Sequence, residues 1–275
     1  MATADRADPA KWPKARVRDD LVLADLQTVL AAGWQDFRAE SGFGLFFGGI
    51  YLVSGWFLTW VTLVRGDVAW LVPAAAGFPL LAPFCAVGLY EISRRRAARL
   101  PLSWGAVLGA LRGRGDEQIL SVGVILFVGF GFWLMIGHGI FAVFLAESGI
   151  GSESLALFDT TAGWLMLVVG SSVGAAIAFF FYAMTVISLP MLVDRNVDFL
   201  TAIFTSFSAI KANQVVMTAW AAIVAASLTA ALLPAFLGLL VVLPVLGHAT
   251  WHLYRIVVLP EPAPVLVSPP VLPAA

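Results

Sequence analysis

Charged residues are scarce in this chain. Only 12% of its 275 residues are Asp, Glu, Lys or Arg, while 60% are hydrophobic and the mean hydropathy is +0.92. Ordinary soluble domains carry about 25% charged residues. This balance excludes an ordinary soluble domain and makes lipid the solvent for much of the chain. The net charge of −1 gives no sign of a nucleic-acid partner, and we expect none.

Residues that bind redox metals are also few. There is one cysteine, Cys85, which excludes an intramolecular disulfide. The histidines are His138, His248 and His252. A catalytic haem–copper oxidase core needs about six histidines for its haems and copper, so this chain is not such a subunit. P-loop, dinucleotide-binding, zinc-protease and CxxC motifs are missing too, and the sequence therefore leans away from an enzyme.

Long apolar runs dominate the rest of the chain. A helix needs about 20 apolar residues to cross a bilayer, because its backbone must satisfy its own hydrogen bonds there. Six segments reach that length, and the last two are separated at Pro234 because one helix of 41 residues would overrun the membrane. We therefore predict an all-α membrane protein with spans at about 43–64, 68–90, 119–146, 163–189, 214–233 and 234–254.

Basic residues predict how these spans are oriented. Fifteen of the sixteen Lys and Arg residues fall before the first span, in the even-numbered connections or after the last span, and only Arg65 falls on the other side. Cytoplasmic loops carry the excess of Lys and Arg. The sequence thus predicts a multipass protein of the bacterial cytoplasmic (inner) membrane with both termini in the cytoplasm.

Three predicted cytoplasmic connections carry apolar residues at helical spacing. Ser103 and Asp198 stand where N-caps of the second and third helices are expected. These helices either lie in the headgroup plane of the membrane or pack on other parts of the protein. The three stripes are Leu23, Leu26, Leu30, Trp34 and Phe37; Trp104, Val107, Leu108 and Leu111; and Leu200, Ile203, Phe204, Phe207 and Ile210.

The order of these elements suggests an internal repeat. Each unit would be an amphipathic interfacial helix followed by a transmembrane hairpin whose second helix contains Pro83, Pro190 or Pro244. Three such units make one six-helix domain over residues 22–255. We expect a disordered cytoplasmic N-terminus over 1–21 and a proline-rich tail over 256–275.

Three sequence blocks carry a family resemblance. PFCAVGLYEISRR at 83–95, SLPMLVDRNVD at 188–198 and LGHATWHLYR at 246–255 resemble a family of uncharacterised bacterial multipass inner-membrane proteins. Some members are labelled as cytochrome c oxidase subunits. The basic run RRRAAR at 94–99 departs from the family pattern, which has an acidic residue after the arginine pair. The resemblance implies a membrane protein of unsettled role, with an accessory or assembly role for an oxidase left open.

Polar residues gather at the predicted cytoplasmic ends of the helices. Glu91 and Asp194 are expected to pair with the arginines there. This cytoplasmic polar layer is either a site for a lipid headgroup, small anion or partner protein, or a lock that holds the helix ends together. Its members are Glu91, Arg94, Asp194, Arg195, Asn213, His248, His252 and Arg255.

Two histidines of this layer are weak metal candidates. His248 and His252 are four residues apart, so they share one helix face and could chelate a metal with a third ligand. Glu91 is the nearest candidate for that ligand by depth, whereas His138 lies at the other end of its helix. Structural hydrogen bonding or headgroup contact explains the pair better, and we predict no cofactor.

Three functions remain open at this point. The first is a non-enzymatic accessory, assembly or scaffold protein that binds other membrane subunits, those of a respiratory complex among the candidates. It would bind them through interfacial helices and small-residue faces such as that with Gly131 and Gly137. The second is a small-solute permease, although no span carries an interior Asp or Glu for proton coupling. The third is a haem or metal protein that uses His248 and His252.

Overall fold

The computed structural model describes residues 15–64, 85–112, 116–148 and 160–259. Residues 85–97 form a further helix that is partly described, and the only β pairing within these ranges is one isolated bridge. The other elements are α1 (Leu23–Ala39), α2 (Ser41–Val64), α4 (Trp104–Leu108), η3 (Gly109–Arg112), α5 (Asp116–Ser148), α6 (Thr161–Thr185), α7 (Ser188–Asp194), α8 (Phe199–Ala212), α9 (Gln214–Leu232) and α10 (Leu239–Val257).

Five stretches in the described residues are long and apolar enough to cross a membrane, where the sequence predicted six spans. They are Ser41–Val61, Glu117–Phe144, Thr161–Asp194, Gln214–Leu232 and Leu239–Val257. The remaining predicted span, 68–90, lies mostly outside the described residues. The fold is thus all-helical over the described ranges, and the number of spans stays a prediction.

The third stretch is interrupted near its end. Helix α6 ends at Thr185, and α7 begins at Ser188 after a two-residue turn that the sequence analysis did not predict. The hydroxyl of Ser206 on α8 accepts a hydrogen bond from the backbone N–H of Ile187 at 3.2 Å and donates to the carbonyl of Ala183 at 2.6 Å. These two bonds satisfy backbone groups that the interruption leaves without helical partners.

The break between the last two spans comes where the sequence expected it, although α10 begins five residues after Pro234. Residues 233–238 form turns. Ala235 and Phe236 have φ values of 51° and 68°, a left-handed conformation that no helix can continue. The indole N–H of Trp56 on α2 donates to the carbonyl of Ala235 at 2.8 Å.

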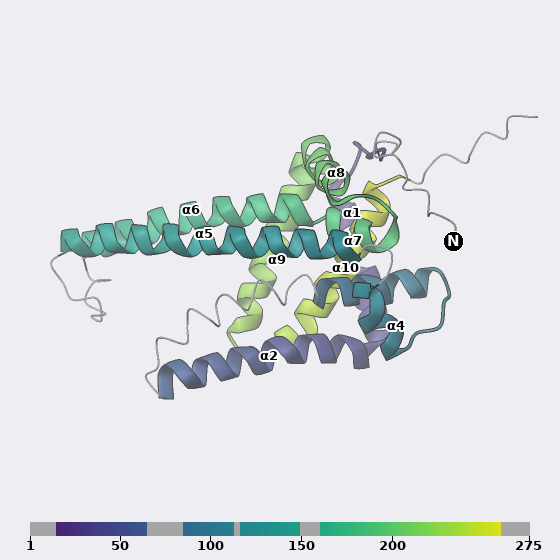
Figure 1. Cartoon of the computed structure of the whole chain (residues 1–275), viewed down its shortest axis with the longest axis horizontal. Coiled ribbons are helices and arrows are strands. Elements are labelled where there is room, and N and C mark those ends of the chain that lie inside the picture. The colour runs from purple at the N-terminus through teal and green to yellow at the C-terminus, as the bar shows by residue number, and fades with distance from the viewer. Residues whose placement is uncertain (1–14, 65–84, 113–115, 149–159, 260–275) are drawn as a thin grey trace, which may run out of the picture.

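Helix α10 is the centre of the packed body. It lies against both α1 and α2, and Figure 1 shows α5 and α6 side by side, projecting from this body as a long pair. Glycines allow the close contacts. A Cβ built on Gly33 of α1 would lie 2.6 Å from the backbone nitrogen of Ala249, and one on Gly48 of α2 would lie 2.8 Å from the Cα of Leu240. Small residues let membrane helices approach in this way.

Helices lie over all three predicted amphipathic stripes, with mixed burial. Helix α1 turns Leu26 and Phe37 inward against the body but leaves Trp34 45% exposed. Helix α8 buries mainly small or polar residues, and its Leu200 and Phe204 are 51% and 67% exposed. Leu200 and Phe204 therefore point away from the body, whereas Ile203 of the same stripe is buried in it. Whether lipid headgroups cover them stays a prediction.

Both predicted N-caps are present. The side chain of Ser103 accepts a hydrogen bond from the backbone N–H of Ala106 at 3.2 Å and so starts α4. Asp198 accepts from the N–H of Thr201 at 2.9 Å and starts α8. Burial raises the pKa of Asp198, but these local hydrogen bonds outweigh it and leave the pKa below its usual value.

The two described ends of the chain lie together. Val17 pairs with Val258 in an antiparallel bridge, and the N–H of Leu259 donates to the carbonyl of Arg16 at 2.9 Å. Val258 is buried, so an apolar residue just beyond α10 draws the N-terminal segment onto the body. Residues 1–14 and 260–275 lie outside the described ranges.

Candidate functional site

A buried carboxylate, Asp36 of α1, organises a polar cluster between three helices. It accepts hydrogen bonds from Ser93 Oγ at 2.7 Å and Arg96 Nε at 2.8 Å, and His252 Nε2 lies 2.8 Å from it. His248 Nδ1 in turn lies 2.8 Å from Ser93 Oγ. We call these five residues the Asp36 cluster. They come from α1, the helix over 85–97, and α10.

Helical spacing explains how three elements bring these side chains to one point. His248 and His252 are four residues apart on α10, and Ser93 and Arg96 are three apart, so each pair shares one helix face. Asp36 follows Gly33 by three residues and therefore lies on the same side of α1, where the glycine lets α10 approach. Close backbone packing at Gly33 thus places the Asp36 carboxylate within reach of His252, and Ser93 connects it to His248.

The charge state of Asp36 fixes the direction of its hydrogen bonds. Burial alone would raise its pKa, but hydrogen bonds from His252, Ser93 and Arg96 outweigh burial and lower the pKa to about 2. The ionised carboxylate only accepts, so Ser93 and His252 both donate to it. Since the hydroxyl proton of Ser93 is engaged in the hydrogen bond to Asp36, its oxygen accepts a hydrogen bond from His248 Nδ1.

The predicted carboxylate–arginine pairs form in two places. Glu91 accepts from Arg94 Nε at 2.7 Å and from Arg95 Nε at 2.6 Å, and its own exposure is only 4%. The hydrogen bond to Glu91 raises the pKa of Arg94, and the negative charge of Asp194 adds to this effect. Asp194 itself lies 3.4 Å from Arg255 Nη1.

Tyr254 connects the Asp194 group to the end of the chain. Its hydroxyl donates to Asp194 Oδ2 at 2.8 Å and accepts from Arg195 Nε at 3.0 Å. Arg195 Nη2 also donates to the carbonyl of Leu259 at 2.8 Å. Asn213 has a comparable role at the other chain end, because its amide donates to the carbonyl of Arg18 at 2.6 Å.

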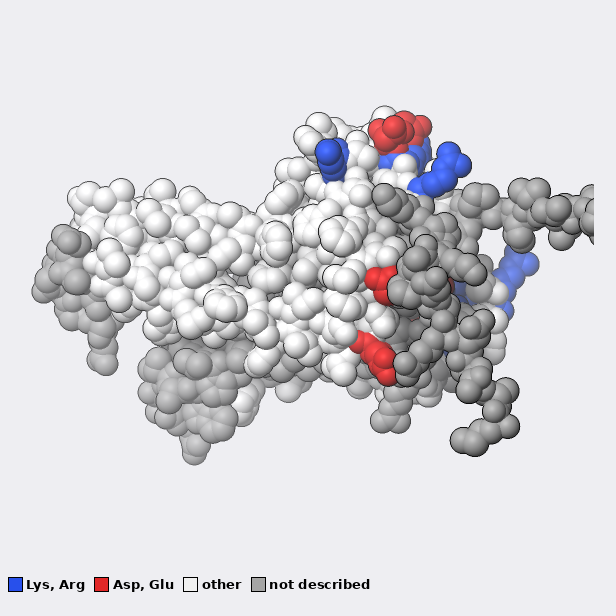
Figure 2. Space-filling model, turned by 45° about the horizontal axis from the view of Figure 1, so that its top comes forward, with Lys and Arg blue, Asp and Glu red and all other residues white. Residues whose placement is uncertain are grey.

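The eight residues predicted as one polar layer therefore fall into four hydrogen-bonded sets. His248 and His252 belong to the Asp36 cluster; Glu91 and Arg94 form a second set with Arg95; Asp194, Arg195 and Arg255 surround Tyr254; and Asn213 holds the N-terminal segment. Figure 2 shows the Lys, Arg, Asp and Glu side chains visible in that view gathered toward one end, and the projecting pair is white.

Glu91 was the third ligand suggested for a metal at His248 and His252. It forms ion pairs with two arginines, and the carboxylate that contacts His252 is Asp36. Among the described residues, no group of three or more His, Cys, Asp and Glu side chains is placed to hold a metal ion. His138 lies elsewhere, on α5, with Nδ1 3.2 Å from the carbonyl of Leu134.

Sequence reasoning missed Asp36, Ser93 and Arg96. Asp36 is only 7% exposed, but it lies about 100° round the helix from Phe37, outside the predicted apolar stripe, so the sequence pattern did not indicate its burial. A carboxylate on a buried face needs a partner. That rule indicates that a partner exists but does not identify it, since Ser93 and Arg96 are more than fifty residues away.

Comparison with known proteins gives one family. Residues 71–194 match the family described as "Predicted integral membrane protein (DUF2189)". This confirms the resemblance to an uncharacterised family of multipass membrane proteins, and the match carries no cytochrome c oxidase label. No curated protein and no solved structure matches the chain. The chain is accordingly an integral membrane protein with several candidate spans.

Proposed function

From its likeness to a family of integral membrane proteins and from the exposure of its projecting pair, we propose that this protein is a non-enzymatic accessory or scaffold subunit of a membrane complex. It binds the helices of other membrane proteins through α5 and α6. The Asp36 cluster then has a structural task, which is to hold α1, α10 and the helix over 85–97 in the arrangement that supports the pair.

The exposure of α5 carries this proposal. Only 17% of the residues in its apolar window are buried within the chain. The helix packs on α6, where Trp133 fills the space above Gly174: a Cβ there would lie 2.9 Å from the ring. The opposite side of α5 has large apolar residues such as Val128 and Met135, which are 50% and 60% exposed. In the membrane this side faces either lipid or another protein.

Two glycines favour a protein partner on that side. Gly131 and Gly139 are eight residues apart, so they are separated by about 80° around the helix and both lie on the side of α5 that faces away from α6. A Cβ added to either would meet nothing within 4 Å, so neither glycine is needed for packing inside this chain. Gly129, in contrast, lies against the ring of Phe181. Open glycines allow another helix to approach the backbone closely.

Replacing Gly131 with isoleucine tests the proposal. We expect the variant to fold normally, since the side chain enters open space, and to recover its membrane partner at least about fivefold less than the unchanged protein, because the new side chain holds a partner helix away. The measurement is affinity purification from native membranes in mild detergent, followed by quantitative mass spectrometry.

Val128→Ile is the matched control, because it enlarges an exposed side chain on the same side of α5 without filling a glycine gap. It should recover the partner as well as the unchanged protein does. If the unchanged protein emerges alone and monodisperse, or if both variants recover the same partner equally, the accessory role through this side of α5 is wrong.

The proposal includes an orientation, with both termini in the cytoplasm of a bacterial cell. Its support is the placement of fifteen of sixteen basic residues on one side of the predicted spans. We expect alkaline phosphatase, which is active only outside the cytoplasm, to be inactive when fused after Ala275 and active when fused after Ser148, the end of α5. Activity at Ala275 would contradict the predicted topology.

A further inference from the structure

A second feature lies apart from the Asp36 cluster: a cavity of about 360 Å³ between α5, α6, α9, α10 and the helix over 85–97. Its rim includes Leu126, Phe181 and Val224, which are half-buried, and its floor includes the buried Tyr90, Trp220 and Thr250. The rim residues lie on segments that span the membrane, so the cavity faces lipid. Its volume falls in the range of sites for small ligands.

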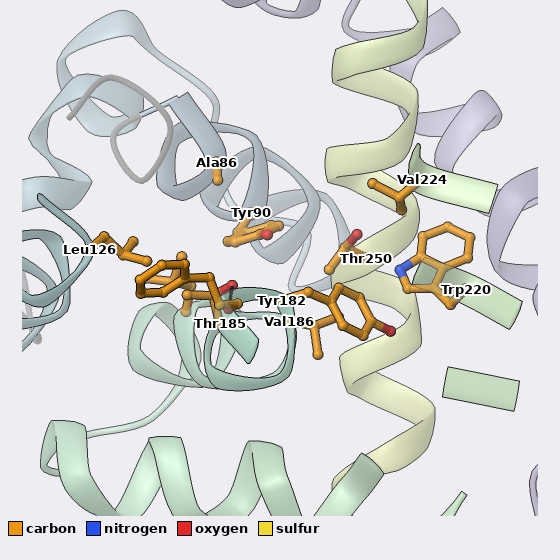
Figure 3. Close-up of a pocket in the computed structure, with 11 residues that line it drawn as sticks. Ala86, Tyr90, Leu126, Tyr182, Thr185, Val186, Trp220, Val224 and Thr250 are labelled. Atoms are coloured by element: carbon orange, nitrogen blue, oxygen red, sulfur yellow. Dashed lines mark hydrogen bonds between the residues drawn. The ribbon is translucent and has the colours of Figure 1, made fainter. Parts of the chain in front are cut away.

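An unpartnered hydrogen-bond donor stands at the floor of this cavity. The side chain of Trp220 is fully buried, and its indole Nε1 has no hydrogen-bond partner in the structure. Figure 3 shows this nitrogen on the side of the ring that faces Thr250 and the cavity. Buried Trp N–H groups usually find an acceptor, because a buried donor that has lost its hydrogen bonds to water is unfavourable without a new partner.

The other polar groups of the lining define what is missing. Thr250 donates its hydroxyl proton to the carbonyl of Leu246 at 2.8 Å, and Tyr182 donates to the carbonyl of Met217 at 2.6 Å. Thr185 donates to the carbonyl of Phe181 at 2.7 Å. Among the described lining residues, the indole N–H of Trp220 and the hydroxyl of Tyr90 are the donors left without a hydrogen bond. None of the described residues that line the cavity is Asp, Glu, Lys, Arg or His. The site therefore suits a neutral acceptor attached to an apolar body.

We propose that this cavity binds the carbonyl-bearing end of a membrane-soluble molecule, whose oxygen accepts the hydrogen bond from Trp220 Nε1 while its hydrocarbon part passes between α6 and α9. Two sources share this chemistry, the ester carbonyl of a bilayer phospholipid and the ring carbonyl of an isoprenoid quinone.

The depth of Trp220 agrees with both sources. It is six residues from the start of α9 at Gln214, which is about 9 Å along the helix. This level lies below the polar residues at the helix ends and above the middle of the bilayer, whose hydrocarbon core is about 30 Å thick. Carbonyl groups of lipids and of quinones that approach the interface reach such a level.

The test uses isothermal titration calorimetry to compare how three probes bind to the delipidated full-length protein in detergent. The probes are an ester-linked phosphatidylethanolamine, its ether-linked analogue, which has no carbonyl, and decylubiquinone. We expect one carbonyl-bearing probe to bind saturably. Trp220→Phe, which keeps the ring but removes the N–H, should weaken that binding about fivefold or more. The ether lipid should bind both proteins equally weakly.

Trp251→Phe is the matched control. Trp251 is also fully buried with an unpartnered Nε1, but it does not line the cavity. Its replacement should leave binding unchanged. Val224→Phe, which fills the rim, should abolish binding and covers the case in which Trp220→Phe fails to fold.

Preference for the ester lipid identifies a phospholipid site, and preference for decylubiquinone identifies a quinone site. The proposal is overturned if no carbonyl probe binds saturably, if the ether analogue binds as tightly as the preferred carbonyl probe, if Trp220→Phe binds that probe as tightly as Trp251→Phe does, or if Val224→Phe still binds it.

Discussion

Replacing Asp36 with alanine is expected to lower the free energy of unfolding by about 3 kcal/mol, one of the two largest effects of a single substitution in this chain. The change removes the acceptor shared by Ser93, Arg96 and His252 and leaves their donors facing a buried gap. Breaking a buried charge network by removing one partner typically has this effect. Unfolding by SDS titration in mixed micelles measures the change.

A solvent-exposed ion pair provides the control. Asp20 pairs with Arg18, but its side chain is 71% exposed. Asp20→Ala should change stability little, because water screens and replaces such a pair. Asp36→Asn, which keeps the shape and removes the charge, should fall between the two alanine variants. Equal stability of the Asp36 and Asp20 variants would show that the Asp36 cluster does not hold the helices together.

The effect of Asp36 should also depend on pH in a defined direction. Its pKa is about 2 in the folded protein against an ordinary value of 3.8. A lowered pKa means that the stabilisation is fully present above about pH 4 and disappears as the pH falls toward 2. The stability difference between the unchanged protein and Asp36→Asn should therefore shrink as the pH falls below about 4.

The long apolar helices could be predicted from the sequence because their signal is local. Backbone groups in lipid must bond within their own segment, so each span must be a continuous apolar run. The break near Pro234 followed from the same length limit. Its details did not, since the left-handed residues Ala235 and Phe236 and the bond from Trp56 depend on α2, almost 180 residues away.

Which side of a helix is buried was harder to predict. Large apolar residues mark the core in a soluble protein, but in a membrane lipid is as apolar as leucine, and small residues form the close contacts. Helix α8 follows the membrane rule: Phe204 is exposed, whereas Ala202, Ser206 and Ala209 are fully buried.

The candidate site was predicted only in part for a different reason. Charge pairs within one helix, such as Glu91 with Arg94, follow from their spacing of three residues. The partners of the two histidines come from α1 and from the helix over 85–97, and their meeting depends on how closely α1 and α10 pack. No pattern along one segment records that distance.

Gly33 sets that distance, and its replacement by alanine is the other large effect we expect. An added Cβ would lie 2.6 Å from the backbone nitrogen of Ala249 and 2.7 Å from the carbonyl oxygen of Val245. Both are backbone atoms of α10 and cannot rotate away, so the helices must separate. We expect a loss of about 2–3 kcal/mol in the free energy of unfolding by SDS titration, as in other overpacked contacts.

Gly49→Ala separates this packing effect from helix propensity. Gly49 also lies in a helix, α2, but a Cβ there would meet nothing within 4 Å. Alanine favours the helix over glycine by up to about 1 kcal/mol, so this variant should be as stable as the unchanged protein or slightly more stable. If Gly33→Ala behaved in the same way, α1 and α10 would not be in close contact. The hydrogen bonds between Asp36 and the side chains of α10 would then have no geometric basis, because the same approach of the two helices brings them within reach.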